Sequence, residues 1–377
     1  MSDLNIPIEP IPDTLEQISV LLLETPSVST VGFLVALEEG YYDELGLPPV
    51  RLRRINERTS GLREQRLGHA QFSVIGMTRA YHNSTLGSQI VSIGRFGTGT
   101  INVLVRRDLH PDIRRLQDLA GYSIGVHYRN EEFIEIVTNA LGIEATLIPY
   151  SGDGLVLLRK GAVDGLCCSS YQTGTSAKFS KFRDDYRSLP IPESGIVLPE
   201  LCVTTLQPFL MKHPTVCRDF MLATWRGWLK AYQDEEKALS VLKKYYESQS
   251  YPYNDRIVRQ QWDAWVASMP LSDTPEENGF LSRDEFDVMR DMMIRVKMVE
   301  QDKAADYEEF FFPVTKPETV KRIEELNEKS NEAAETRSIP LEFFRNAAPN
   351  PIVFRRQTGD KAIPSVRWQY KRSEQGT

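Results

Sequence analysis

Short apolar runs separated by mixed stretches dominate the N-terminal half of the chain. These runs have the length and composition of buried strands, and the amphipathic stretches between them have helical spacing. This alternation predicts an α/β architecture with mostly parallel sheets. The predicted strands are Ile18–Leu23, Val50–Ile55, Phe72–Ile75, Ile90–Ile93, Ile101–Val105, Tyr122–Val126, Ala145–Pro149, Asp164–Cys168 and Leu201–Thr205.

Helical patterns fill the connections and then most of the C-terminal half. One helix is expected over Gly32–Glu44 and another over Asn130–Leu141, and each is followed by a glycine that can end it. After the last predicted strand, Gln207–Tyr246 carries the broad apolar face of packed helices. The pattern therefore predicts an α/β part followed by a helical part.

The last segment, residues 311–377, differs from the rest. Lys316–Thr336 is charge-rich with a helical pattern, and prolines then interrupt any long element. Aromatic and apolar residues among these prolines disfavour pure disorder. We expect a C-terminal extension that packs over the body and is a candidate contact for a homodimer or another partner.

Charge and composition narrow the function. Lys+Arg 45 against Asp+Glu 52 leaves a net charge of -7, which gives no general support for nucleic-acid binding. The four cysteines form no CxxC pair and the five histidines no HxxxH or HExxH pattern, so no structural zinc and no cofactor are predicted. Buried free thiols are the simplest interpretation of the cysteines.

The first residues of the chain bear on where the protein is located in the cell. Met1–Thr14 contains acidic residues and no Lys or Arg, unlike the basic start of a secretory signal. No apolar run approaches the roughly 20 residues that a membrane-spanning helix needs. We therefore expect a cytoplasmic protein without membrane insertion.

Four sequence blocks carry a family resemblance. GFLVALEEGYYDELGL at residues 32–47 is followed by LQDLAGYSIGV at 116–126, by LLRKGAVDG at 157–165 and by the stretch 213–228. In this order and spacing they resemble the type II periplasmic-binding-like proteins, in the branch of the sulfonate- and nitrate-binding proteins and the thiamine-pyrimidine synthase. The resemblance covers about residues 15–300.

The resemblance implies a two-lobed Venus-flytrap fold with a helical C-terminal extension. Two α/β lobes enclose a ligand cleft, and two crossing strands form the hinge. Lobe one is expected from residues 1–104 and 205–310, and lobe two from residues 105–204. The apolar runs Ile101–Val105 and Leu201–Thr205 lie where the chain has to cross.

Candidate ligand contacts follow from a general property of open α/β sheets. Ligands collect beyond the carboxyl ends of strands and at helix N-termini, whose unpaired N–H groups favour anions. In lobe one this rule selects, from three loops, Ser27, Ser29, Thr30, Gly76, Met77, Thr78, Gly97 and Thr98. N-capping alone remains the alternative for the hydroxyl loop, and a simple flexible turn for the glycine loop.

In lobe two the strongest cluster is His127-Tyr128-Arg129-Asn130, which opens a helix. The guanidinium of Arg129 is suited to a bidentate contact with a carboxylate, sulfonate or sulfinate. His127 titrates near neutral pH and suits general acid–base catalysis. Cys168 and Ser169 end another strand and are expected in the same cleft. An ordinary exposed helix start is the alternative explanation.

Three functions stay open. The proteins that this chain resembles include an aromatic sulfinate desulfinase, which uses a cysteine just before the opening helix. At that position this chain has Ser27, whose hydroxyl is a much weaker nucleophile. We expect a clamshell protein that binds a small acidic molecule, with an aromatic acid among the candidates, and that acts as a lyase or hydrolase of desulfinase or decarboxylase type. His127 and Ser27 are the catalytic candidates. The alternatives are the substrate-binding component of an ABC importer and an intracellular ligand sensor.

Overall fold

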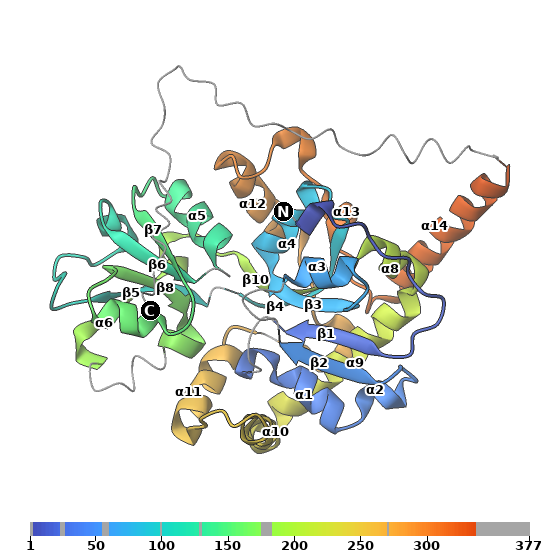
Figure 1. Ribbon diagram of the computed structural model, residues 1–377, viewed down its shortest axis with the longest axis horizontal. Helices are drawn as coiled ribbons and strands as arrows, with labels where there is room; N and C mark the ends of the chain where they lie inside the picture. Colours follow the sequence, from blue (N-terminus) through green and yellow to red (C-terminus); the bar gives the residue numbers. More distant parts are fainter. Residues whose placement is uncertain are drawn as a thin grey trace, which may run out of the picture.

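A computed structural model describes residues 3–22, 27–54, 60–98, 100–127, 130–174, 183–269 and 271–336. Two five-stranded sheets form the centres of two lobes that lie side by side (Figure 1). The lobe-one sheet has the order β2 (Val50–Arg54), β1 (Ile18–Leu22), β3 (Phe72–Gly76), β10 (Pro199–Leu206) and β4 (Ile90–Thr98). The lobe-two sheet has the order β7 (Thr146–Tyr150), β6 (Ser123–His127), β8 (Gly165–Ser169), β5 (Ile101–Arg106) and β9 (Tyr186–Pro190).

In each sheet one strand runs against the other four. In lobe one this strand is β10, which pairs antiparallel with β3 and β4, and in lobe two it is β5, which pairs antiparallel with β8 and β9. Both follow a crossing of the chain between the lobes. Their amino ends therefore lie at the edge where the other strands end, and this edge faces the opposite lobe.

The predicted two-lobed α/β fold is confirmed, and the crossings lie slightly earlier than expected. The second sheet begins with Ile101, so residues 101–104 belong to lobe two. The return strand begins with Pro199, so residues 199–204 belong to lobe one. The strand β9 had no counterpart in the prediction.

Helices cover both sheets. Lobe two contains α5 (Glu131–Ala140), α6 (Gly154–Arg159) and a single π-helical turn, η4 (Ser170–Gly174). Lobe one contains α1 (Val31–Glu38), α2 (Tyr41–Glu44), α3 (Gly61–Arg66), α4 (Met77–Thr85), α8 (Gln207–Lys212), α9 (Pro214–Gln233), α10 (Glu235–Ser248), α11 (Asp255–Val266), α12 (Arg283–Arg295), α13 (Tyr307–Phe310) and α14 (Pro317–Thr336).

Two of the predicted helices are interrupted for local reasons. The helix expected over Gly32–Glu44 divides at Gly40, whose φ of 74° is left-handed and suits glycine. The helical stretch after β10 divides at Pro214, which takes the first position of α9, and at Asp234, whose carboxylate accepts the Lys237 N–H at the start of α10.

Aromatic side chains form much of the lobe-one core. The rings of Phe72 and Phe220 stack with centroids 4.1 Å apart, joining the sheet to α9. The helices α1 and α9 approach closely, because a Cβ at Gly227 would lie 2.2 Å from the carbonyl oxygen of Gly32. This packing fixes α1 against the body of lobe one.

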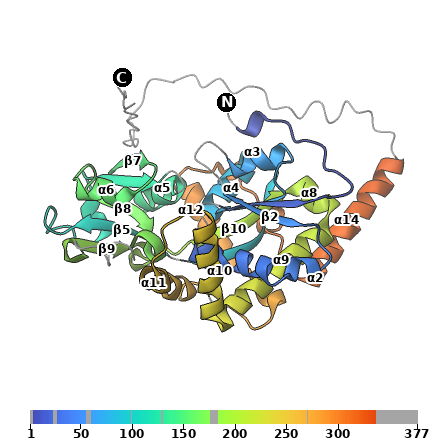
Figure 2. The same ribbon diagram turned by 60° about the horizontal axis from the view of Figure 1, so that its bottom comes forward.

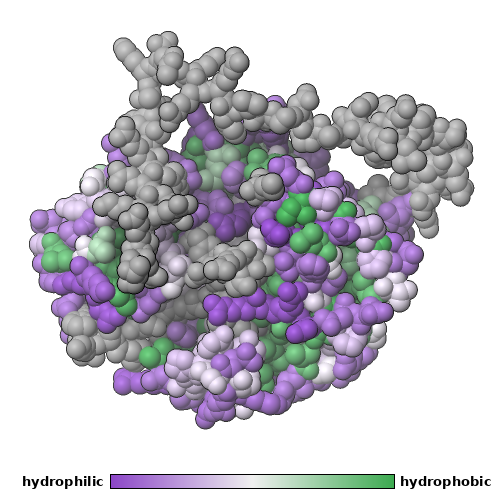
Figure 3. Space-filling view, in the orientation of Figure 1, coloured by the Kyte–Doolittle hydropathy of each residue, from purple (hydrophilic) through white to green (hydrophobic). Residues whose placement is uncertain are grey.

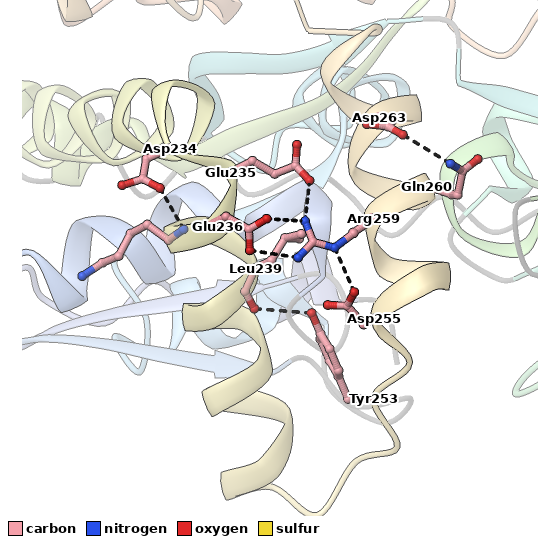
Figure 4. A network of polar contacts seen from close by, with 10 residues as sticks. Asp234, Glu235, Glu236, Leu239, Tyr253, Asp255, Arg259, Gln260 and Asp263 are labelled. Carbon is pink, nitrogen blue, oxygen red and sulfur yellow. Dashed lines mark hydrogen bonds and ion pairs between the residues drawn. The ribbon is translucent and has the colours of Figure 1, made fainter.

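Helices α10 and α11 lie next to each other at the bottom of the molecule in Figure 1, with α11 on the side of lobe two (Figure 2). Arg259 of α11 donates hydrogen bonds to Glu236 at 2.7 and 2.9 Å and to Glu235 at 3.0 Å, all from α10 (Figure 4). At the end of α11, Trp265 meets Tyr171 of lobe two in an edge-on contact, with centroids 4.9 Å apart. The Arg259 network therefore supports a helix that touches both lobes.

The C-terminal extension begins as part of lobe one. Phe311 bridges to Ser92 of β4, and Phe310, Phe311 and Val314 are buried. The helix α14 then packs against α8 and α9. Residues 337–377, which carry the remaining aromatic residues of the predicted arm, lie outside the described residues, so the partner contact stays a prediction.

The described surface shows no membrane-spanning element. Among the helices of the described residues, none combines the length and apolar content needed to cross a bilayer. The face shown in Figure 3 is largely hydrophilic, with apolar residues in small separate groups.

Candidate functional site

A cavity of about 200 Å³ lies between the two lobes. Its wall comes from the ends of strands in both sheets and from the first residues of three helices. The described lining residues are Gly76, Thr78, Ile101, His127, Asn130, Phe133, Tyr150, Gly152, Asp153, Gly154, Cys167, Cys168, Ser169, Tyr171, Thr173, Glu200 and Leu201.

The strand directions explain why these residues meet. Gly76, His127 and Tyr150 end β3, β6 and β7, whereas Ile101 and Glu200 stand at the beginnings of the reversed strands β5 and β10. All these strand ends face the opposite lobe. The cavity therefore occupies the place where open α/β sheets collect ligands.

Two helix N-termini, one from each lobe, open onto the cavity. Gly76 is the N-cap of α4 and Asn130 is the N-cap of α5, and neither helix has a side-chain hydrogen bond at its cap. A third short helix, α6, differs because its N-cap Asp153 accepts the Leu155 N–H at 2.9 Å. The starts of α4 and α5 direct backbone N–H groups and positive partial charge toward the cavity, which favours an anionic group.

A buried carboxylate stands at the hinge side of the cavity. Glu200 at the start of β10 accepts the Thr100 N–H at 3.1 Å and also the Thr100 hydroxyl. Thr100 lies between β4 and β5, so this contact joins the two crossings of the chain. The pairing holds Glu200 in place on the cavity wall.

Both cysteines of the lining have poorly ionised thiols. Burial, with a smaller contribution from the Glu200 charge, raises the pKa of Cys167 to about 12. Burial also raises the pKa of Cys168 well above its ordinary value, and its thiol donates to the Asn102 amide oxygen at 3.2 Å. Neither thiol is a thiolate at neutral pH, so neither is an activated nucleophile.

Aromatic rings supply the apolar part of the wall. The rings of His127 and Tyr150 meet edge to face with centroids 5.5 Å apart. Burial raises the pKa of Tyr150, so its phenol stays protonated at neutral pH. Phe133 and Tyr171 complete this surface, which suits the carbon skeleton of a small ligand.

Beside the cavity, an ion pair joins the lobes. Arg79 in the first turn of α4 binds Glu132 of α5 in a bidentate manner, with Nε–Oε1 at 2.9 Å and Nη2–Oε2 at 2.7 Å. The aromatic contact between Tyr171 and Trp265 is a second connection between the lobes. This ion pair and this aromatic pair are two of the described contacts between the lobes.

Of the candidate residues selected from the sequence, six line the cavity. They are Gly76, Thr78, His127, Asn130, Cys168 and Ser169. Tyr128 and Arg129, and the side chain of Thr98, lie outside the described residues. The roles assigned to all of them stay predictions.

The hydroxyl loop before α1 is absent from the described lining. Ser27, Ser29 and Thr30 are buried, with exposed fractions of 3%, 2% and 1%. The Ser27 hydroxyl accepts the Ser29 N–H at 3.4 Å, and the Thr30 hydroxyl oxygen accepts the Ser27 N–H at 3.0 Å, which makes a capping box. These groups cap the 3-10 turn Val28–Thr30 that leads into α1, in line with the N-capping alternative for this loop.

Two further candidates lie away from the described lining of the interlobe cavity. The side chain of Met77 is fully buried in the core. Gly97 lines a separate cavity of about 130 Å³ with Trp225 and Asn278. Its φ of 63° and its approach to Trp265, 2.8 Å from an added Cβ, account for glycine at this position.

Sequence reasoning missed several lining residues, above all Glu200, Tyr150 and Asp153. Tyr150 directly follows a predicted strand, and Asp153 precedes a helix with the residue type that caps prefer. Glu200 stands at the beginning of a strand, and only the reversed direction of β10 brings it to the edge of the sheet that faces the cavity. Reading the return strand as antiparallel would have found it.

In the part of the chain that the structure describes, no three His, Cys, Asp or Glu side chains converge in a way that would hold a metal ion.

Comparison with known proteins places the chain in a broad structural group. The family model described as NMT1/THI5 like matches residues 27–238, more than half of the chain. No curated protein sequence matches at a significant level.

Among similar solved structures is the periplasmic aliphatic sulphonate binding protein SsuA from Escherichia coli, with TM-score 0.60, 11% identity and coverage of 78% of this chain and 92% of that one. The ligand binding component of an ABC-type import system from Staphylococcus aureus, solved with zinc bound, has TM-score 0.60, 11% identity and coverage of 82% and 99%. The desulfurization enzyme DszB has TM-score 0.50, 13% identity and coverage of 82% and 99%. At these identities the likeness shows the fold.

Proposed function

This chain belongs to the NMT1/THI5-like family, and on that premise we propose that it is a solute-binding protein of the kind found in ABC-type import systems. One small molecule with an anionic group occupies the cavity between its lobes. The anionic group lies at the N-termini of α4 and α5, and the remainder of the ligand lies against the aromatic wall.

The convergence of these two helix starts carries the proposal. Gly76 and Asn130 are N-caps from different lobes, both line one cavity, and neither helix is capped by a side chain. An anion held there receives N–H groups from both lobes. Because an open arrangement would lose half of these donors, the ligand stabilises the closed arrangement.

The solved relatives are compatible with this function. Two of them are a sulphonate binding protein and a ligand binding component of an import system. A sulfonate is a compact anion of the type that two helix N-termini favour. A short alkanesulfonate is therefore a suitable first probe for this chain.

Binding without chemistry fits the cavity better than the lyase or hydrolase reaction expected from the sequence. Ser27 is engaged in a capping box, and the pKa values of Cys167 and Cys168 are raised by burial. Neither cysteine is thus an activated nucleophile, and Ser27 lies outside the described lining. Catalysis with His127 as acid or base, and the cytoplasmic location, stay predictions.

Isosteric charge changes at two helix caps test the proposal. Asn130→Asp keeps a good N-cap on α5 but adds a negative charge at the cavity wall, so we expect affinity for short alkanesulfonates to fall about tenfold. Asp153→Asn removes a negative charge from the same wall and raises that affinity. Isothermal titration calorimetry of both variants and the wild type, over a panel of short alkanesulfonates and alkanoates, measures both effects.

Asn139→Asp is the matched control, because Asn139 is an exposed residue on the same helix outside the cavity lining. Its affinity is expected to equal that of the wild type. Equal affinities of Asn130→Asp and Asn139→Asp would refute the anion position. Failure of every anion in the panel to bind the wild type would refute the proposed function.

A further inference from the structure

Glu200 gives the cavity a feature that an anion site does not need. The residue has an exposed fraction of 8% and lines the cavity from the first residues of β10. A carboxylate in such a position repels a neighbouring anion and is costly to bury without a hydrogen-bonding partner. Its presence bears on which ligands the cavity accepts.

The position of Glu200 is fixed by the hinge. The Thr100 N–H and hydroxyl both donate to the same oxygen, Oε2. Thr100 is itself buried, and its carbonyl oxygen accepts the Ser170 N–H at 2.6 Å. Because the backbone N–H of Thr100 can only donate, Glu200 acts as an acceptor and is oriented before any ligand enters.

The other groups on the wall reinforce this acidic character. The titratable side chains that line the described cavity are His127 from β6, Tyr150 from β7, Asp153 before α6, Cys167 and Cys168 from β8, Tyr171 from η4 and Glu200 from β10. Among the described lining residues there is no lysine or arginine side chain. Two carboxylates therefore face a ligand whose anionic end is held by helix N-termini.

We propose that the ligand is zwitterionic, with an amino or similar N–H donor that binds Glu200 in addition to its anionic group. The inference rests on the proposed binding of an anion in this cavity. An ammonium group beside Glu200 forms a charge-assisted hydrogen bond, which is among the stronger polar contacts. Small amino sulfonates and amino carboxylates combine both groups within a short chain.

Matched ligand pairs test the amino group alone. The probes are 3-amino-1-propanesulfonate against 1-propanesulfonate, and 4-aminobutanoate against butanoate. For the wild type we expect the amino member of at least one pair to bind tenfold or more tightly than its partner. Glu200→Gln keeps the side-chain size and an oxygen acceptor for Thr100, and it is expected to reduce this preference below about threefold.

Glu193→Gln is the control, since Glu193 is an exposed lobe-two residue outside the described cavity lining. It is expected to keep the wild-type preference. The wild-type ratio remains decisive if Glu200→Gln does not fold, which circular dichroism would detect.

Equal affinity of the two members of both pairs for the wild type would overturn the inference and leave the proposed anion binding intact. An amino preference that Glu200→Gln retains would overturn the role of Glu200. Absence of binding by all four probes at millimolar concentration would contradict both this inference and the proposed function. The outcomes of the two proposals are therefore distinguishable.

Discussion

Two helix starts look alike in the sequence and behave differently in the structure. Before α1, Ser27 and Thr30 close their own backbone in a capping box and are buried. Before α5, Asn130 makes no side-chain cap and lines the interlobe cavity. Both segments follow a strand and precede a helix, so position and residue type alone do not make a binding site. What separates them is burial: the Ser27 capping box closes a 3-10 turn inside the lobe-one core, whereas the start of α5 faces the cavity.

Packing around α1 accounts for the difference. Its first turn lies within the lobe-one core, where α1 meets α9 at Gly32 and Gly227. A buried helix start has no access to water, so its N–H groups need partners within the protein. The start of α5 faces a cavity instead, and water or a ligand can serve it. The predictions below test this contrast.

The largest expected effect comes from the α1–α9 contact. In Gly227→Ala the new Cβ would lie 2.2 Å from the Gly32 carbonyl oxygen and 2.7 Å from Ala36, so the helices must separate. We expect the free energy of unfolding to fall by about 3 kcal/mol, as in severe overpacking. Urea denaturation measures it.

Gly76→Ala is the matched substitution at the open start of α4. There the added Cβ would lie 3.8 Å from the Glu200 carbonyl oxygen, an ordinary contact distance, and φ is -63°. Its stability is expected to stay close to that of the wild type. A similar loss of stability in Gly227→Ala and Gly76→Ala would show that the close packing of α1 does not explain the effect of Gly227→Ala.

A smaller loss of stability is expected when the capping box before α1 is disrupted. Ser27→Ala removes the hydroxyl that accepts the Ser29 N–H, and should lower stability by about 1 kcal/mol. Because Ser27 is absent from the cavity lining, the affinity for an anionic probe should not change. Thermal unfolding and calorimetry on the same variant separate the two readouts. A loss of affinity without a loss of stability would restore Ser27 as a ligand or catalytic residue.

The contrast also shows what the sequence can and cannot predict. Apolar runs located nine of the strands and both crossings, because burial on two faces leaves a strong local signal. The cavity edge was predictable from strand ends, which selected His127 and Asn130. The place of Glu200 in the cavity wall depends on the direction of β10. The burial of the Ser27 capping box depends on packing between distant segments. Neither is encoded within a short window of sequence.

Contact between the lobes should have a moderate effect on affinity. Glu132→Gln weakens the bidentate bond with Arg79, which holds α5 beside α4. Since this bond stabilises the closed arrangement, its loss should weaken ligand binding about threefold at low salt. The difference should shrink as salt screens the wild-type pair. Titration calorimetry at two salt concentrations measures both trends.

Glu38→Gln is the control for this pair, because Lys244 binds Glu38 within lobe one. Removal of that exposed pair should leave ligand affinity unchanged. If Glu132→Gln binds as tightly as Glu38→Gln at low salt, the Arg79–Glu132 pair does not favour closure.

The smallest expected effect concerns the charge on α5. Burial, and secondly the neighbouring Glu132 charge, raise the pKa of Glu135 above its ordinary 4.5. The folded state therefore holds this proton more tightly than the unfolded state. Relative stability is highest below the unfolded pKa and falls as pH rises through the folded pKa. Helix α1 carries no charged residue before Glu38, and the hydrogen bond from Lys244 lowers the pKa of Glu38 instead.

Glu135→Gln removes the titrating group, so it should stabilise the protein near pH 7 by at most about 0.5 kcal/mol and have no effect near pH 4. Urea denaturation at both pH values gives the difference. The exposed Glu144, replaced by Gln, is the control that should show no gain at either pH. A gain in stability that is equal at both pH values would mean that packing, and not the charge of Glu135, limits the stability of α5.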